Sequence, residues 1–171
     1  MGDAYADRML SPLQQQALRA PRSIGVHSVA FQHGKQIPRE FTGHGDDINP
    51  PLSWTGVPNN AQALAIVVDD PDAAGGTFTH WTVWNLPPRI GGVEAGVKVV
   101  PLGGIEGRND FGTSGYRGPK PPGGTHRYVF RVLALDKFLD APPNAPVDEV
   151  WRHISGHSLA WGELVGTFTK P

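Results

Sequence analysis

The pattern of apolar and polar positions is mainly that of β-strands. Residues 126–136 alternate between a face that carries Tyr128 and a face that carries Arg127, which is typical of a strand. The run from residue 61 to 69 is apolar on both faces and predicts a central strand that is covered from both sides. With the turn residues that separate them, these patterns predict strands over residues 24–31, 62–69, 80–86, 126–136 and 162–169.

Two short helices are expected at the edges of this β domain. The residues from Ser11 to Gln14 combine an N-cap, a proline at the first helical position and a capping-box glutamine. A helix this short is unstable alone in water, so we expect residues 1–22 to form an arm that packs on residues 23–171 or across a homodimer. The second helix is predicted over residues 147–154. The expected fold class is a mainly β, antiparallel domain with few peripheral helices.

Composition and charge exclude several classes of protein. A length of 171 residues fits one core, and zero Cys excludes disulfides and thiolate metal sites. The 15 basic and 16 acidic residues give a net charge of −1, which argues against a nucleic-acid partner and against anchoring to a membrane surface. The apolar run at residues 63–68 is too short to span a bilayer. Because no apolar secretory segment is visible at the N-terminus, we expect a cytoplasmic protein.

Candidate chemistry gathers at the ends of three predicted strands. Asp70 follows the most apolar strand, His80 opens the next one, and His126 with Tyr128 opens another after the turn-rich stretch 101–125. No strand is evident in that stretch, and loops so long are often functional. Although an Asp before a Pro also starts ordinary turns, we expect Asp70, His80 and His126 to converge on one point.

This combination of residue types suits an anion. An Asp beside a His favours the imidazolium and fixes the orientation of the ring. Two protonated imidazoles, the Tyr128 hydroxyl and backbone N–H groups of a glycine-rich loop would then donate to the ligand. A weak phosphoester or acyl-ester hydrolase with a histidine base and Ser114 nearby remains an alternative, as does an interaction module that uses the arm. His153 and His157 could clamp a metal, but Gly156 interrupts their turn, so no metal site is expected.

Several ordered motifs carry a resemblance to a known family. The motifs are Asn49-Pro50-Pro51-Leu52-Ser53-Trp54, Asp70-Pro71-Asp72-Ala73, His80-Trp81, Gly118-Pro119 and His126-Arg127-Tyr128. The chain resembles the phosphatidylethanolamine-binding protein family over about residues 24–170, and within it the bacterial and archaeal Raf-kinase-inhibitor-like branch. It differs from the usual motif at Ala74, and it ends without the C-terminal helix of mammalian members.

The resemblance implies a large central antiparallel sheet, with a smaller sheet on one side and helix on the other. It also implies a small pocket for phosphate-type anions, formed by Asp70, His80, Gly118, His126 and Tyr128. We therefore expect a non-enzymatic binding protein without a cofactor. Its ligand would be a small anion, free or on a phospholipid headgroup, a phosphorylated small molecule or a phosphopeptide; any protein partner is left open.

Overall fold

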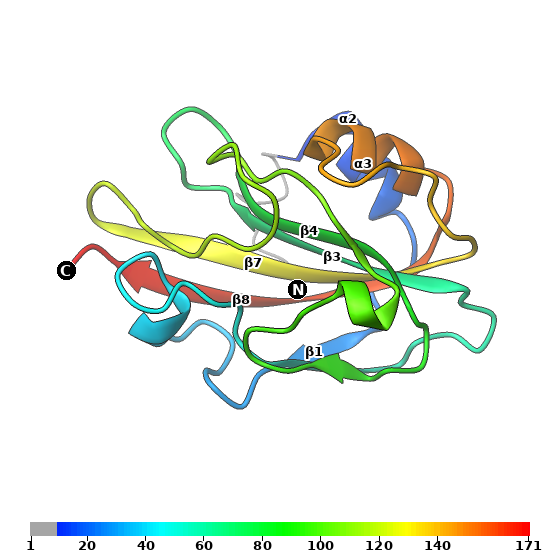
Figure 1. Cartoon of the computed structure of the whole chain (residues 1–171), viewed down its shortest axis with the longest axis horizontal. Helices are drawn as coiled ribbons and strands as arrows, with labels where there is room; N and C mark the ends of the chain where they lie inside the picture. The colour runs from blue at the N-terminus through cyan, green and yellow to red at the C-terminus, as the bar shows by residue number, and fades with distance from the viewer. Residues whose placement is uncertain (1–9) are drawn as a thin grey trace.

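Two antiparallel sheets form the core of the fold in a computed structural model that describes residues 10–171 (Figure 1). The large sheet has the strand order β6-β4-β3-β7-β8, and the small sheet has the order β1-β2-β5. The large sheet consists of β3 (Ala63–Asp70), β4 (Phe78–Leu86), β6 (Ile105–Glu106), β7 (Thr125–Leu135) and β8 (Ser158–Thr169). The small sheet consists of β1 (Gly25–His27), β2 (Leu52–Thr55) and β5 (Gly92–Val93).

Helices cover one face of the large sheet and the small sheet covers the other (Figure 1). The helices are α2 (Pro12–Ala17) and α3 (Val147–Ile154), and two 3-10 turns are η1 (Arg39–Phe41) and η2 (Val100–Leu102). The predicted mainly β fold class is confirmed, as is the arrangement of layers that the family resemblance implied.

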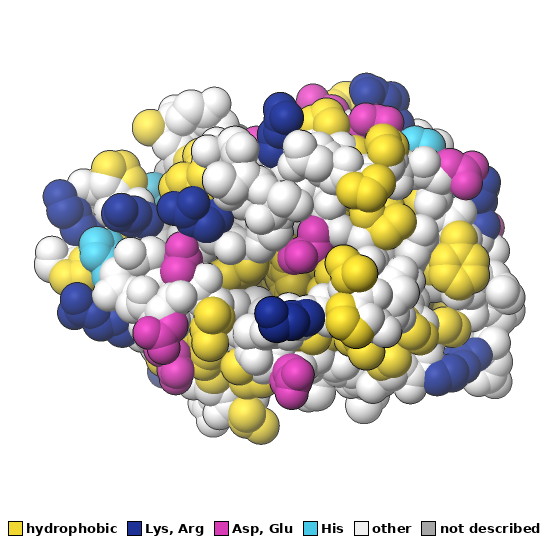
Figure 2. All heavy atoms as spheres, viewed as in Figure 1, with side chains coloured by type: hydrophobic (Ala, Val, Ile, Leu, Met, Phe, Trp, Pro, Cys, Tyr) yellow, Lys and Arg dark blue, Asp and Glu magenta, His cyan; other side chains and the backbone are white. Residues whose placement is uncertain are grey.

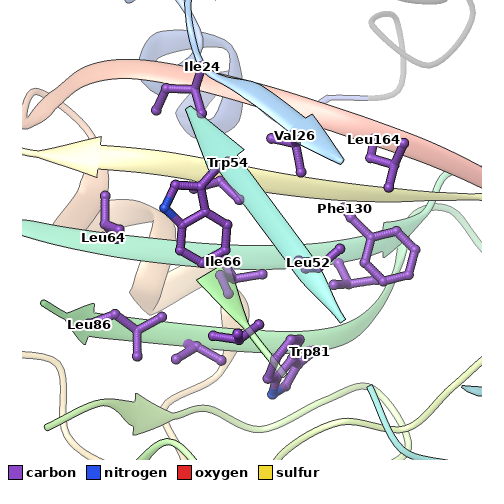
Figure 3. Close-up of a cluster of buried hydrophobic side chains, with 14 of the residues drawn as sticks. Ile24, Val26, Leu52, Trp54, Leu64, Ile66, Trp81, Leu86, Phe130 and Leu164 are labelled. Carbon is purple, nitrogen blue, oxygen red and sulfur yellow. The ribbon is translucent and has the colours of Figure 1, made fainter. Parts of the chain in front are cut away.

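The central strand β3 is buried along its whole length. Leu64 and Ile66 pack toward the small sheet beside Trp54 (Figure 3), whereas Ala65 and Val67 pack under the helices. Each face of β3 therefore packs in its own cluster of buried side chains, and the strand is covered from both sides as its apolar sequence predicts.

The short helix α2 packs on the sheet of its own chain. Its capping box is formed, because Ser11 Oγ accepts a hydrogen bond from Gln14 N at 3.3 Å and Gln14 Oε1 accepts one from Ser11 N at 2.8 Å. Trp161 Nε1 in β8 donates to the carbonyl oxygens of Leu18 and Ala20 at 3.1 and 2.9 Å. The alternative, packing across a homodimer, stays a prediction, as does the boundary at residue 22; residues 1–9 lie outside the described part.

A chain of buried charges runs beneath α2. Asp69 accepts hydrogen bonds from Gln14 Nε2 at 3.3 Å and from Thr79 Oγ1 at 3.1 Å, and it lies 3.6 Å from the Arg131 guanidinium. Arg131 in turn pairs with Glu163 at 3.1 Å. Burial raises the pKa of Asp69 to about 6, against the opposing effect of Arg131. The helix is therefore attached to the sheet through an ionisable side chain.

Two sequence predictions about strands need correction. The strand predicted at 24–31 is confined to β1, because the chain turns where Ser28 Oγ accepts a hydrogen bond from Ala30 N at 3.1 Å. The stretch 101–125 was expected to contain no strand, but it includes β6. The sequence analysis also missed β2 and β5. These strands are two to four residues long, so they show little periodicity.

A β-bulge changes the direction of His80. Val68 pairs with Trp81, but the next residue, Asp69, pairs with Thr79, so His80 has no residue opposite it in β3. In a regular strand His80 and Trp81 would point to opposite faces. Trp81 packs in the cluster toward the small sheet, and His80 contacts Tyr128 of that same cluster. The extra residue places both side chains on one face, as bulges near functional sites often do.

Candidate functional site

A cavity of about 260 Å³ lies where β3 ends and where β4 and β7 begin. Because β3 runs antiparallel to both neighbours, its last residue lies beside the first residues of the other two strands. The cavity is lined by Asp70, Ala73, Ala74, Gly75, Phe78, His80, Phe111, Lys120, Pro121, Pro122, His126 and Tyr128.

Four of the five predicted site residues line this cavity. They are Asp70, His80, His126 and Tyr128. The Tyr128 ring lies near both imidazoles, with its centroid 5.3 Å from that of His80 and 6.4 Å from that of His126. The fifth residue, Gly118, is not part of the lining.

Asp70 holds His126. Its Oδ2 lies 2.6 Å from His126 Nδ1, and its Oδ1 accepts a hydrogen bond from Asp72 N at 2.8 Å. Both carboxylate oxygens therefore have partners within the protein. His126 Nε2 has none among residues 10–171. Asp70 is therefore placed to orient the His126 ring, as the sequence analysis expects of an Asp beside a His.

The neighbouring carboxylate is neutralised by an arginine. Arg127 Nε and Nη2 donate to the two oxygens of Asp72 at 2.9 and 2.8 Å, and the Arg127 backbone N–H adds a bond at 2.9 Å. These hydrogen bonds from Arg127 lower the pKa of the Asp72 carboxyl. The Asp-Pro-Asp turn after β3 is thereby attached to the start of β7, and the negative charge of Asp72 is compensated.

His80 contributes a lone pair to the cavity rather than a charge. Its Nδ1 lies 2.6 Å from the carbonyl oxygen of Arg117, which can only accept, so Nδ1 carries a proton. Burial lowers the pKa of His80 and favours the neutral ring, in which Nε2 is an acceptor. The expected pair of charged imidazoles is therefore wrong for His80.

The Tyr128 hydroxyl is buried and makes no hydrogen bond within the described residues. The residue is 1% exposed, and the hydroxyl has no partner within residues 10–171. Burial raises the pKa of Tyr128, so the hydroxyl keeps its proton. A buried polar group without a partner is costly, and a ligand in the cavity would supply the missing partner.

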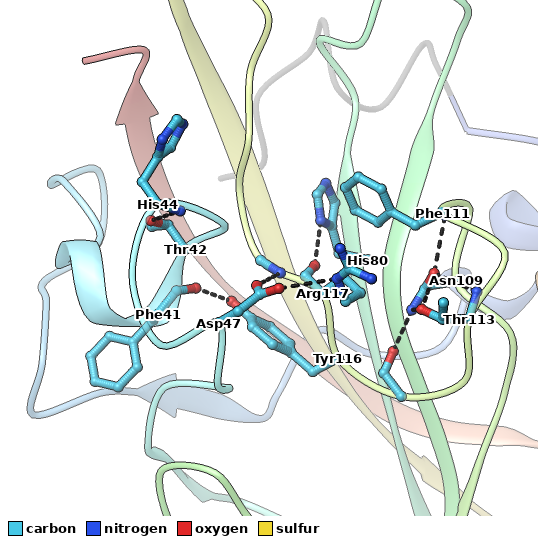
Figure 4. Close-up of polar contacts among 12 residues, drawn as sticks. Phe41, Thr42, His44, Asp47, His80, Asn109, Phe111, Thr113, Tyr116 and Arg117 are labelled. Atoms are coloured by element: carbon cyan, nitrogen blue, oxygen red, sulfur yellow. Dashed lines mark hydrogen bonds and ion pairs between the residues drawn. The ribbon is translucent and has the colours of Figure 1, made fainter.

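The loop before Gly118 is fixed by hydrogen bonds to β4 and within itself. Thr79 N donates to Asp110 Oδ2 at 2.7 Å, and Arg117 N donates to the carbonyl oxygen of His80 at 3.1 Å. Asn109 bonds the loop from inside, with Nδ2 donating to the Gly115 carbonyl oxygen at 2.9 Å (Figure 4). The wall of the cavity is therefore attached to the strand that carries His80.

Two aromatic rings lie against His80, one from this loop and one from β4. Phe111 lies against the His80 ring (Figure 4), with centroids 5.6 Å apart. It also lies against the Phe78 ring, at 4.8 Å. The Arg117 guanidinium lies over the Phe111 ring, 5.1 Å from its centroid. These rings exclude water from His80 and so account for the burial that lowers its pKa.

Gly118 positions the wall instead of lining the cavity. Its backbone N–H donates to Asp47 Oδ1 at 2.6 Å, and Asp47 Oδ2 accepts a hydrogen bond from Arg117 Nε at 3.0 Å (Figure 4). A Cβ atom on Gly118 would lie 2.3 Å from the carbonyl oxygen of Phe41. A glycine is needed here for close backbone approach, and its N–H group is already occupied.

Sequence reasoning missed several lining residues. Phe78, Phe111 and Lys120 line the cavity, and the latter two come from the long stretch that was expected to be functional. Among residues 10–171 Lys120 makes no ion pair. The apolar residues gave no signal in the sequence, because nothing local distinguishes an aromatic residue beside a cavity from one in the core.

The lining is defined by the polar groups that it contains and by one that it lacks. Ser114, the nearest nucleophile in the sequence analysis, is not part of it. Within residues 10–171 no group of three or more His, Asp or Glu side chains could hold a metal ion. Donors at His126 and Tyr128, an acceptor at His80 and the cation of Lys120 together surround one small space.

The chain matches known proteins along most of its length. The sequence pattern of the phosphatidylethanolamine-binding protein family matches residues 27–169. A UPF0098 protein of Methanothermobacter thermautotrophicus is 45% identical over 150 residues, which cover 86% of this chain and 99% of that protein. A UPF0098 protein of Pyrococcus horikoshii is 46% identical over 154 residues, covering 86% and 77%.

Solved structures show the same fold. A phosphatidylethanolamine-binding protein homologue of Chlamydia trachomatis superposes with a TM-score of 0.82 at 34% identity, covering 88% of this chain and 99% of that one. YbcL of E. coli, described as a member of the mammalian family, also gives 0.82 at 29% identity, covering 87% and 99%. The two sheets and their layers therefore form a binding-protein fold. The chain belongs to the phosphatidylethanolamine-binding protein family, in its bacterial and archaeal branch.

Proposed function

We propose that this protein is a non-enzymatic binding protein whose cavity takes a phosphate-type group. The observation that carries the proposal is the set of unused polar atoms around one space: His126 Nε2, the Tyr128 hydroxyl and His80 Nε2. A phosphate group has several acceptor oxygens for the two donors, and Lys120 at the same cavity supplies a compensating cation.

The neutral His80 ring narrows the chemistry of the ligand. Its Nε2 needs a donor, and a phosphate that retains one P–OH group supplies it. Inorganic phosphate carries such a proton at neutral pH, and a monoester carries one in its monoanion, which forms below its second pKa of about 6. A diester of the phospholipid type has none. We therefore favour free phosphate, or the monoanion of a phosphate monoester, over a phospholipid headgroup.

Calorimetric titration with inorganic phosphate tests the proposal. We expect saturable binding that His126→Ala weakens by about tenfold or more, because a charge-assisted hydrogen bond is lost. His157→Ala is the matched control, since that histidine pairs with Asp136 away from the cavity. Equal loss in both variants, or no binding by the unaltered protein, would overturn the proposal. Dimethyl phosphate in the same experiment tests the choice of a monoester, and tighter binding of it would favour a lipid headgroup.

The absence of catalysis is part of the proposal. Among the described residues the cavity lining contains no Ser, Thr or Cys side chain that could act as a nucleophile. We expect no turnover of p-nitrophenyl acetate or p-nitrophenyl phosphate above that of the His126→Ala variant. Turnover that His126→Ala abolishes would establish the hydrolase alternative instead.

Charge distribution supports a small ligand over a nucleic acid. Figure 2 shows basic and acidic side chains interspersed over one face of the molecule, including the region around the centre of that view. None of the helices in the described part of the chain is long and apolar enough to cross a membrane. A cytoplasmic location stays a prediction.

A further inference from the structure

Phe111 is the residue of the turn 109–115 that lines the cavity. It is 40% exposed and belongs to neither cluster of buried side chains in the described chain. Its ring nevertheless packs on His80 and on Phe78, with centroids 5.6 and 4.8 Å apart. Phe111 therefore covers one side of His80 without filling the core.

The turn that carries Phe111 is fixed from inside by Asn109, which is 1% exposed. Its Oδ1 accepts hydrogen bonds from Phe111 N at 3.0 Å and from Thr113 N at 3.2 Å (Figure 4). Gly112 N donates to the Asn109 carbonyl oxygen at 3.0 Å, which closes a β-turn with Phe111 as its third residue. The position of the Phe111 ring is therefore set by the buried amide of Asn109.

Arg117 joins Phe111 and His80 through two different groups. Its guanidinium lies over the Phe111 ring, 5.1 Å from the centroid, and its Nε donates to Asp47 at 3.0 Å. A cation over an aromatic face is attractive. The carbonyl oxygen of the same residue accepts the hydrogen bond from His80 Nδ1 at 2.6 Å. The group that orients His80 and the group that lies on its cover thus belong to one residue.

Two opposing effects decide the charge of His80. The residue is 3% exposed, and burial, which lowers its pKa, is the largest of these effects. The carboxylates of Asp70, Asp110 and Asp47 raise the same pKa. The other charged or titratable side chains on the loop and in the cavity lining are Arg117, Lys120, His126 and Tyr128. Loss of part of the cover would leave the carboxylates to favour the imidazolium.

We propose that Phe111 determines which oxyanions the cavity accepts, because it keeps water from His80 and so keeps His80 Nε2 an acceptor. This inference rests on the proposed function. An acceptor selects a ligand oxygen that carries a proton, as hydrogen phosphate does, and disfavours sulfate, which carries none near neutral pH. Without the ring of Phe111, His80 becomes a charged donor, and the cavity accepts both anions.

Titration of the His80 ring followed by NMR tests the first step in the free protein. We expect Phe111→Ala to raise the pKa of His80, so that the imidazolium fraction at about pH 7 increases at least about threefold. Phe111→Leu retains an apolar cover and should change this fraction less. Phe138→Ala is the matched control, since Phe138 is exposed and lies outside the lining of this cavity in the described chain. An unchanged His80 titration in Phe111→Ala would overturn the proposal.

Calorimetric titration with phosphate and with sulfate tests the second step. At about pH 7 we expect Phe111→Ala to lower the ratio of phosphate to sulfate affinity at least about threefold, mainly because sulfate binds more tightly. Phe111→Leu and Phe138→Ala should retain the ratio of the unaltered chain. The ratio is the useful quantity, because a simple loss of packing weakens the binding of both anions alike. An unchanged ratio would overturn the proposal.

The same measurements separate this inference from the proposed function. If the unaltered chain prefers phosphate and Phe111→Ala has the same preference, the role of Phe111 is wrong and the proposed function stands. If the unaltered chain binds neither anion, both are wrong. Because Phe111 is partly exposed, we expect Phe111→Ala to fold. If it does not, Phe111→Gln, which replaces the ring by a polar side chain of similar length, carries both comparisons with the same expected results.

Discussion

Nδ1 of His80 donates to the carbonyl oxygen of Arg117 across 2.6 Å, and this contact defines which atom of the ring meets a ligand. The loop that carries Arg117 is itself attached to β4, since Arg117 N donates back to the His80 carbonyl oxygen at 3.1 Å. The ring is thereby held in one orientation with Nε2 toward the cavity. What His80 accepts or donates there depends on its protonation, which leads to the first prediction.

Phosphate and sulfate should differ in their pH dependence. At about pH 8 both are dianions, but hydrogen phosphate keeps a P–OH group that can donate to neutral His80, so we expect it to bind about tenfold more tightly. Sulfate has no such proton and needs the imidazolium. Because burial lowers the pKa of His80, sulfate affinity should increase only as the pH falls below the ordinary histidine value of about 6.5.

Isothermal titration from about pH 5 to pH 8 checks this ordering. His157→Ala serves as the control, since it removes a histidine that is remote from the cavity. Equal affinities for the two ions at high pH would show that His80 does not discriminate between them.

Replacing Tyr128 by Phe should separate binding from stability. The hydroxyl is buried without a partner in the described chain, so its removal should leave the free energy of unfolding unchanged or raise it by about 1 kcal/mol. The same change should weaken phosphate binding, because one donor is lost. Urea unfolding and calorimetry on one preparation measure both quantities. A clear loss of stability would show that the hydroxyl has a structural partner.

Asp69 should make stability depend on pH. Burial raises its pKa to about 6, above the value of about 3.9 in an unfolded chain. The folded state therefore binds the proton more tightly, and the stabilisation from this group is present below about pH 4 and is lost as the pH rises through about 6. The loss is on the order of 3 kcal/mol.

The Asp69→Asn variant should lack this pH dependence, as measured by urea unfolding from about pH 4 to pH 8. The lowered pKa of His80 makes the free energy of unfolding increase with pH, which is opposite to the effect of Asp69. The pH profile of the variant must therefore be compared with that of the unaltered chain. Asp136→Asn changes an exposed carboxylate that pairs with His157 and provides the control. Parallel profiles for Asp69→Asn and the unaltered chain would contradict the prediction.

Removal of residues 1–22 should lower the melting temperature. The deletion exposes the surface that Ala17 covers and removes the two carbonyl oxygens that accept hydrogen bonds from Trp161 Nε1. It also removes the ion pair between Arg22 and Glu163. The milder change Ser11→Ala should lower the free energy of unfolding by about 1 kcal/mol, because the N-cap is lost. Gln16 is exposed, so Gln16→Ala should lower it little. Calorimetric melting measures all three. An unchanged melting temperature after deletion would show that the arm contributes nothing, and a changed sedimentation coefficient would favour the homodimer.

Local patterns in the sequence determined the main elements of the fold. The alternation over residues 126–136 and the doubly apolar run at 61–69 predict β7 and β3, because the two faces of a strand are set by a period that neighbouring residues share. The capping box at Ser11 predicts α2 for the same reason, since its hydrogen bonds join residues only three apart. The end of β3 and the start of β7 then bring Asp70, His126 and Tyr128 together.

Only the tertiary structure decided the position and charge of His80 and the roles of the loop residues around it. His80 reaches the cavity through a bulge, which depends on how β4 pairs with β3 and so on residues far apart in the chain. Phe111 buries the ring from a loop, and Gly118 serves the close approach to Phe41 instead of the ligand. The charge of His80 was predicted wrongly because desolvation depends on what surrounds a side chain, and the sequence pattern carries no measure of those surroundings.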